Sequence, residues 1–276
     1  MSASQPGKPS RQPGSFQRRV EVIVAVVACS AMALVYATTH WIAPRLFSHF
    51  EYAPELARVP KRTSTAHHAK GDPINIAIVG TQAELEAAMH AAGWVAAARA
   101  NRATDVAIAK SVLLNRPDST APISQLYLFG RPQDFAFERE VGRSARSRHH
   151  VRFWLAHDIA HDNRPVWLGD ATFDVRAGVT RTLLPTHHIG PDVDQERDTT
   201  VASLVAAKQV DTLFTVSGMG IRVGSHNAGG DRFDTDGELD VVVLSPGGAL
   251  SAHTDTLAEP AIVAMKDRVW NWFHTR

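Results

Sequence analysis

Histidine, arginine and aspartate side chains in the middle of the chain have spacings that could assemble a catalytic site. Alternate residues of a β-strand share one face, so the run 148–154 would present His150 and Arg152 together. The run 164–175 would present Asp174 in the same way from a neighbouring strand, and a histidine pair follows in the next element. The candidate catalytic residues are His150, Asp174, His187 and His188.

The chemistry that this cluster suggests is metal-assisted hydrolysis. Two imidazoles and a carboxylate can ligate a transition metal, and a third histidine could complete the ligands of a hydrolytic zinc ion. The chain has no compact ligand motif such as H-E-x-x-H, so the cofactor is left unassigned. An ordinary cross-strand ion pair between Arg152 and Asp174 would explain the same residues without catalysis.

A second group of residues could recognise phosphate. The stretch 139–152 is the densest basic segment of the chain, and the planar guanidinium group pairs well with phosphate oxygens. The alternative is a loop whose charges face only water. The candidate ligand-binding residues are Arg143, Arg146, Arg148 and Arg152.

An apolar run from Val22 to Ile42 lies behind a basic N-terminus. A helix rises about 1.5 Å per residue, so about 20 residues cross a hydrocarbon layer of about 30 Å. We therefore predict an uncleaved transmembrane anchor over 20–43, because a cleaved signal peptide usually has a shorter apolar region of about 7–15 residues. Arg18 and Arg19 adjoin the run on a side without acidic residues, which favours a cytoplasmic N-terminus.

The composition is that of an ordinary globular chain. Of its 276 residues, 44% are hydrophobic and 21% are charged, and the formal net charge of +1 argues against a nucleic-acid partner. The single cysteine, Cys29, falls inside the anchor, so the rest of the chain has no thiol chemistry. The predicted organisation is a disordered basic N-terminus over 1–19, the anchor over 20–43, a stalk over 44–71, one domain over 72–250 and a helical extension over 251–276.

Hydrophobic patterning predicts an α+β fold, a mostly antiparallel sheet with helices packed on one side. The predicted strands are 75–79, 123–129, 135–138, 148–154, 164–175, 186–189, 210–218 and 237–244. Predicted helices begin near Thr81, Thr104, Asp192 and Pro260. The alternation along the strands also predicts that Phe153, Phe173 and Val175 belong to the core.

Several segments together resemble the C-terminal domain of LssY-type bacterial membrane proteins, over about 72–245. In order along the chain they are DPINIAIVGTQAELEAAMHAAGW, LYLFGRPQDFAFE, RHHVRFW, GDATFDV, PTHHIGPDVDQERD and TDGELDVVVL. In that family the domain can follow DedA-like or phosphatidic-acid-phosphatase-type membrane domains, which implies an envelope and lipid-phosphate context. The resemblance implies no activity for the domain itself, and this chain has one predicted span instead of such a membrane domain.

These observations lead to one main hypothesis and one alternative. The main hypothesis is a membrane-anchored accessory or binding domain of the bacterial envelope that engages phosphate-bearing or other anionic ligands, such as anionic lipid. The expected location is the bacterial inner membrane, spanned once through residues 20–43, with the C-terminal domain in the periplasm. The alternative is the metal-dependent hydrolase.

Overall fold

The computed structural model describes residues 15–97, 125–141, 144–179, 185–218 and 224–274. It divides into two compact units, Met1–Phe47 and Ser48–Arg276. The helix predicted from about Thr104 lies outside the described residues.

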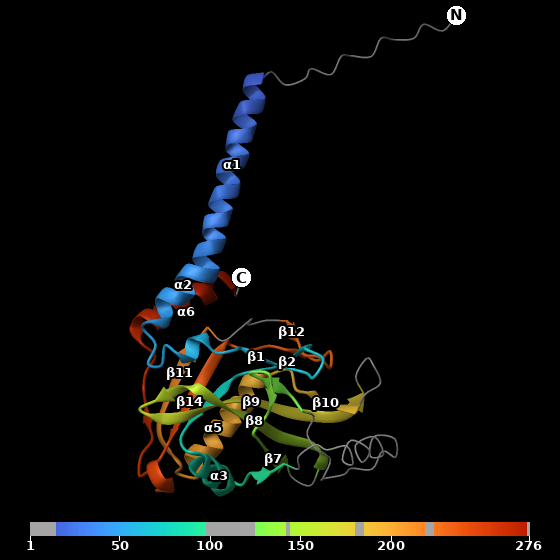
Figure 1. The fold of residues 1–276 in the computed structure, drawn as a ribbon, viewed down its shortest axis with the longest axis vertical. Coiled ribbons are helices and arrows are strands. Elements are labelled where there is room, and N and C mark those ends of the chain that lie inside the picture. Colours follow the sequence, from blue (N-terminus) through green and yellow to red (C-terminus); the bar gives the residue numbers. More distant parts are fainter. Residues whose placement is uncertain (1–14, 98–124, 142–143, 180–184, 219–223, 275–276) are drawn as a thin grey trace, which may run out of the picture. The chain divides into compact units, whose positions relative to one another are not determined.

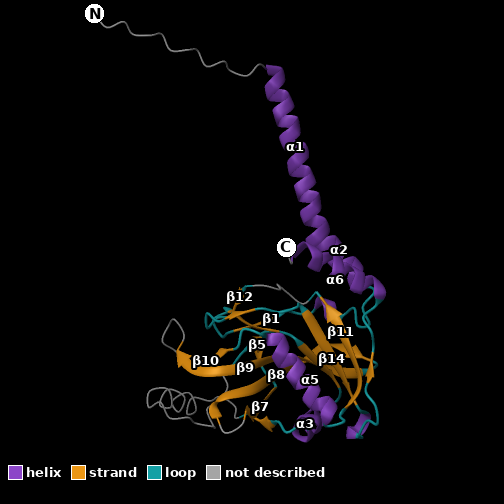
Figure 2. Ribbon diagram, turned by 180° about the vertical axis from the view of Figure 1, so that it is seen from behind, coloured by secondary structure: helices purple, strands orange, loops and turns teal. Residues whose placement is uncertain are grey.

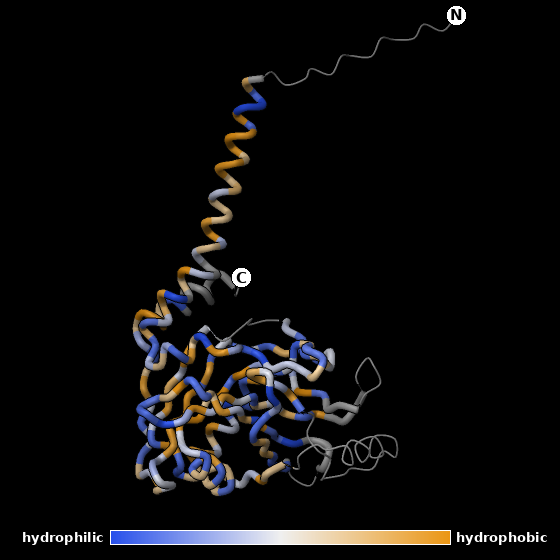
Figure 3. Tube along the Cα trace, in the orientation of Figure 1, coloured by the Kyte–Doolittle hydropathy of each residue, from blue (hydrophilic) through white to orange (hydrophobic). Residues whose placement is uncertain are grey.

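The first unit contains a long apolar helix, α1 (Ser15–Ala37). Within it, the 22 residues from Phe16 to Ala37 form an apolar stretch with no buried residue, and Figure 3 shows mostly apolar colouring along α1 apart from a hydrophilic segment near its start. A π-helical turn over Thr38–Ile42 and the short helix α2 (Ala43–Ser48) follow. The helix thus begins at Ser15, inside the predicted disordered N-terminus, and α1 alone is long and apolar enough to cross a membrane among the described helices.

The second unit is built on a nine-stranded sheet with the strand order β15-β11-β14-β3-β9-β8-β7-β4, in which β10 also pairs with β9 (Figure 1). Parallel pairing occurs between β11 and β15 and between β14 and β3, while the other described pairs of this sheet are antiparallel. The strands are β3 (Ile76–Val79), β4 (Val95–Ala96), β7 (Phe135–Val141), β8 (Ser144–His161), β9 (Arg164–Val179), β10 (Pro185–Ile189), β11 (Val210–Ser217), β14 (Glu238–Leu244) and β15 (Asp255–Thr256). This architecture confirms the predicted α+β fold.

Two helices, α3 (Gln82–Ala91) and α5 (Val193–Ala206), cover one face of the sheet, as Figure 2 shows. Their apolar side chains share one core with the inward residues of the strands, including Leu85 and Leu204 against Phe153. Thr81 and Glu84 form a capping box at the start of α3, where the sequence predicts that a helix begins. The Asp192 carboxylate accepts the backbone N–H of Gln195 at the predicted start of α5.

The opposite face of the sheet is covered by the segment that the sequence predicts to be a stalk. Ala53, Leu56 and Val59 are buried in a second core with Trp154 and Phe214. The segment continues into a small sheet of order β2-β1-β5-β6, made of β1 (Arg62–Ser64), β2 (Lys70–Pro73), β5 (Tyr127–Leu128) and β6 (Arg131–Pro132). The predicted stalk is therefore wrong from residue 48 onward, because its spaced apolar residues pack onto the sheet.

The C-terminal segment also belongs to the second unit. Strand β15 pairs with β11, and the last helix, α6 (Ala261–His274), buries Val263. A short hairpin of β12 (Ser225–His226) and β13 (Arg232–Phe233) lies in the loop that precedes β14. The described residues 251–274 thus contain a short strand and a helix attached to the domain, instead of the purely helical extension predicted over 251–276.

The long β8–β9 hairpin positions most of the predicted site. It reverses at Asp162 and Asn163, which both have positive φ angles of 51° and 60°, as a tight two-residue turn requires. Its register places Arg152 opposite Asp170. Beside this pair, a Cβ atom on Gly169 would lie 2.8 Å from the Phe153 ring, so glycine allows the close approach here.

Candidate functional site

His150 and Asp174 meet on one face of the β8–β9 hairpin, as the alternation of the two strands predicts. The His150 Nδ1 atom lies 3.2 Å from Asp174 Oδ2, and the two side chains are 2% exposed. His150 Nε2 lies 2.7 Å from the Thr172 hydroxyl. Arg148 adds a guanidinium group 3.6 Å from the same Asp174 oxygen and binds Glu138 at 2.7 Å.

Arg152 is paired with Asp170 and Asp72, not with Asp174 as predicted. Its Nη1 atom lies 3.1 Å from Asp170 Oδ1 and 3.6 Å from Asp72 Oδ2. The antiparallel register explains the difference, because it puts Arg152 opposite Asp170 and Arg148 opposite Asp174. Burial raises the pKa of Asp170 to about 7, although the Arg152 charge acts in the opposite direction.

His188 has a different partner from the other predicted catalytic residues. Its Nδ1 atom lies 2.5 Å from Asp231 Oδ1, and the Asp231 carboxylate also accepts the backbone N–H of Ile189. His187 lies in β10, but its side chain is outside the described part of the structure. No group of three or more His, Cys, Asp or Glu side chains among the described residues is arranged to hold a metal ion.

A single amide joins the His188 pair to the Arg152 pair. The Asn227 Nδ2 group donates to Asp72 Oδ1 at 3.0 Å, and the Asn227 Oδ1 atom accepts the backbone N–H of Asp231 at 2.9 Å. We call this set the buried charge network, and its members are Asp72, Glu138, Arg148, His150, Arg152, Asp170, Asp174, His188, Asn227 and Asp231. Each arginine and histidine within it lies beside at least one carboxylate, which suits a structural role.

Two of the four predicted ligand-binding arginines, Arg148 and Arg152, are therefore not available to an external anion. Arg148 is 6% exposed and Arg152 is 4% exposed, and both face carboxylates inside the domain. Arg143 lies outside the described residues, and Arg146 lies in β8 with an undescribed side chain. Arg148 lies in strand β8 inside the domain, so for this residue the alternative of a loop whose charges face only water is wrong.

The predicted core residues of this hairpin are only partly right. Phe153 is fully buried, whereas Phe173 is half-buried and Val175 is 40% exposed. The core between the sheet and helices α3 and α5 reaches Ala171 but does not include these two residues of β9.

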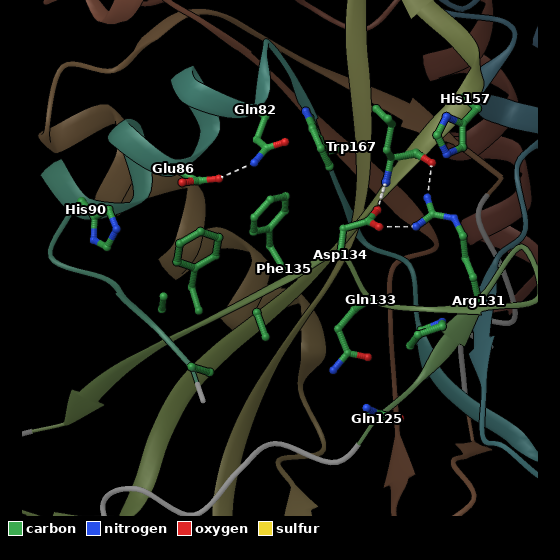
Figure 4. Close-up of a pocket in the computed structure, with 16 residues that line it drawn as sticks. Gln82, Glu86, His90, Gln125, Arg131, Gln133, Asp134, Phe135, His157 and Trp167 are labelled. Carbon is green, nitrogen blue, oxygen red and sulfur yellow. Dashed lines mark hydrogen bonds and ion pairs between the residues drawn. The ribbon is translucent and has the colours of Figure 1, made fainter. Parts of the chain in front are cut away.

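A pocket that the sequence analysis did not predict lies between α3 and the strands β6 to β9. Its volume is about 770 Å³, and Figure 4 shows residues of α3 on one side and Arg131, Asp134 and His157 on the other. The lining residues are Gln82, Glu86, His90, Ala96, Ala97, Gln125, Arg131, Pro132, Gln133, Asp134, Phe135, Ala136, Phe137, Leu155, His157 and Trp167.

Aromatic rings form the apolar part of this pocket. The half-buried Phe135 ring makes an edge contact with Trp167, with 5.5 Å between the ring centroids, and stacks near Phe137 at 6.4 Å. Trp167 is held in place because its indole N–H donates to the Gly80 carbonyl at 2.9 Å. Phe135 thus presents a supported aromatic surface to the cavity.

Polar groups surround the aromatic surface. The Gln82 amide donates to Glu86 at 2.8 Å on α3. On the opposite side, Arg131 pairs with Asp134 and also donates to the Leu155 carbonyl at 2.6 Å. The alternation of the FAF segment could have indicated that Phe135 and Phe137 share a face, but no local signal connects them to α3.

The protein is an α+β domain that contains a buried charge network and is preceded by an N-terminal apolar helix. Residues 56–239 match the family model described as LssY C-terminus, so the chain belongs to this family. The match begins within the predicted stalk, in agreement with the packing of that segment. No curated protein and no solved structure matches the chain.

Proposed function

We propose that the protein is a membrane-anchored ligand-binding domain of the bacterial envelope. The observation that carries the anchor is α1, whose stretch Phe16–Ala37 is long and apolar enough to cross a membrane and contains no buried residue. Such a helix is stabilised when lipid replaces water around its apolar side chains. The proposed topology is a single pass through the inner membrane with the N-terminus in the cytoplasm and the domain in the periplasm, following Arg18 and Arg19.

The pocket beside α3 is the proposed ligand site. Ligand sites are typically concave, with aromatic surface and a few polar groups that fix orientation, and the volume of about 770 Å³ suits a small molecule. The polar groups comprise carboxylates, amides and imidazoles, and Arg131 is already paired with Asp134. This lining has no excess of positive charge, so a hydroxyl-rich neutral ligand suits it better than a phosphate.

The proposed ligand class is therefore a saccharide. The C–H groups of a sugar ring can pack on the Phe135 ring, while its hydroxyls donate to carboxylates such as Glu86 and accept from amides such as Gln82. The hydroxyls of a saccharide can thus form hydrogen bonds with the carboxylates and amides of the pocket without a bound cation. The pocket thus supports a binding function and calls for no catalytic group.

Binding of N-acetylglucosamine oligosaccharides to the full-length protein in detergent tests this proposal. Phe135→Ala should weaken binding at least tenfold, because it removes the aromatic surface, whereas Phe135→Tyr should retain it. Phe173→Ala is the matched control, since it removes another half-buried ring outside the pocket. Isothermal titration calorimetry measures all four proteins.

Two results would contradict the proposed ligand class. Equal saccharide binding by Phe135→Ala and the native protein would separate binding from the pocket. Binding of inorganic phosphate in place of saccharide would favour the anionic-ligand hypothesis. That hypothesis now rests on Arg143 and Arg146, because Arg148 and Arg152 are neutralised inside the domain. The metal-dependent hydrolase stays a prediction that no described cluster supports.

A further inference from the structure

The connection between the apolar helix and the folded domain is short. Ten residues, 38–47, separate the last residue of α1 from Ser48, the first residue of the second unit. Ten residues span about 15 Å as a helix and at most about 35 Å when fully extended. If α1 spans a bilayer, the surface of the domain around Ser48 is held within reach of the lipid headgroups.

The surface where the chain enters the domain carries exposed aromatic and apolar side chains. Phe50 and Tyr52 are 45% and 44% exposed, and Met265 on α6 is 52% exposed. Hydrogen bonds connect these segments: the Tyr52 hydroxyl donates to the Ala258 carbonyl at 3.0 Å, and the Ser217 hydroxyl donates to Glu51 and accepts from Lys266. These residues therefore form one patch although they lie more than 200 positions apart.

Positive side chains accompany the apolar residues. Lys61 donates to the Gly218 carbonyl, Lys266 donates to the Ser217 hydroxyl, and Arg268 is exposed on α6. Partial burial and then the neighbouring Lys266 charge lower the pKa of Lys61, which indicates that the two ammonium groups are close enough to repel each other. An external anionic surface would relieve this repulsion.

We propose that this patch, defined as Phe50, Tyr52, Lys61, Met265, Lys266 and Arg268 and called the tether surface, lies on the anionic bilayer that α1 crosses. Aromatic and apolar side chains with nearby cations are the composition of protein surfaces that bind at a membrane interface. The inference rests on the proposed anchor and goes beyond it, because it assigns an orientation to the domain and a lipid partner to a named surface.

A fluorescent probe on the full-length protein in nanodiscs tests the contact. Cys29→Ser removes the single cysteine, and Met265→Cys in that background carries an environment-sensitive label on the tether surface. The control is Leu250→Cys, whose native side chain is 70% exposed. Leu250 adjoins Ser251, whose backbone N–H donates to the Lys208 carbonyl near the start of β11. Strand β11 is about 23 Å long, and the tether surface lies at its other end, near Ser217.

In nanodiscs with phosphatidylglycerol, the label at 265 should shift to shorter wavelength and be quenched several-fold more strongly by spin-labelled lipid than the label at 250. Lys61→Gln with Arg268→Gln should reduce this quenching at least twofold, and 1 M salt should do the same. Lys208→Gln is the matched charge control and should leave the quenching unchanged, because Lys208 lies at the other end of β11.

Other outcomes would overturn the proposal. Equal quenching at 265 and 250 would mean that the tether surface does not contact lipid. Strong quenching at 265 that persists in pure phosphatidylcholine and in the charge variants would mean that the tether surface contacts lipid without requiring anionic headgroups, which contradicts the proposed anionic partner. Failure of the protein to enter nanodiscs would contradict the anchor, and so the proposed function as well, whereas incorporation without quenching would contradict this inference alone.

Discussion

At the scale of single residues, the buried charge network is the most distinctive feature of the domain. Arg152 lies between Asp170 and Asp72, and the Asp170 side chain has no exposed surface. Removing a charge from water costs several kcal/mol, so these groups are stable only in one another's presence. The network therefore specifies how β2 and the β12–β13 hairpin fit onto the β8–β9 hairpin.

Arg152→Met should destabilise the protein by about 3–5 kcal/mol, because it leaves two buried carboxylates without their cation. The control is Arg232→Met, which removes a 60% exposed partner of Asp234 and should cost only about 0–1 kcal/mol. Urea unfolding of the detergent-solubilised protein, followed by tryptophan fluorescence, measures both free energies of unfolding. Similar small costs for the two variants would mean that Arg152 is a solvated surface residue, as an external ligand site would require.

At the scale of elements, Glu84 joins three parts of the chain at the start of α3. Its carboxylate accepts the Thr81 N–H at 2.7 Å, the Gly247 N–H at 2.6 Å and an Arg164 N–H at 2.8 Å. Burial by itself would raise the pKa of Glu84, but these three donors outweigh burial and lower it to about 2. The capping box thus also fixes α3 to the sheet.

Glu84→Gln should lower the free energy of unfolding at pH 7 by about 1–3 kcal/mol, since it removes the charge from three hydrogen bonds. The folded-state pKa is below the ordinary value of 4.5, so the contribution of Glu84 is complete above pH 4.5. It is lost as the pH falls towards 2, and the native protein and the variant should converge there.

Glu86→Gln is the matched control for this prediction, because the Glu86 carboxylate accepts a hydrogen bond from Gln82 of the same helix and so joins no distant parts of the described chain. Denaturant unfolding between pH 2 and 7 provides the comparison. A constant difference between Glu84→Gln and the native protein across this range would contradict the proposed role of the ionised carboxylate.

At the scale of the whole molecule, the proposed topology places the domain outside the cytoplasm. A reporter enzyme that is active only outside the cytoplasm, fused after Arg276, should be active, because Arg18 and Arg19 favour a cytoplasmic N-terminus. A reporter that is active only inside the cytoplasm serves as the control at the same junction and should be silent. The opposite pair of activities would reverse the proposed orientation.

The local elements of this protein follow from the sequence. The apolar run, both helix caps and the alternating strands of the sheet were predictable, because each depends on residues that are neighbours along the chain. The period of two also predicts which face of its own strand His150 and Asp174 occupy, but their contact required the two strands to pair.

Only the tertiary structure decided which of these elements touch. The register of β8 and β9 determines that Arg152 lies opposite Asp170. The packing of Ala53, Leu56 and Val59 onto the sheet makes the predicted stalk part of the domain. The pocket around Phe135 required α3 and the β8–β9 hairpin to approach from distant positions in the chain. Such contacts depend on the burial of whole faces against one another, a free energy that is shared among distant residues and leaves no pattern in any short segment of the sequence.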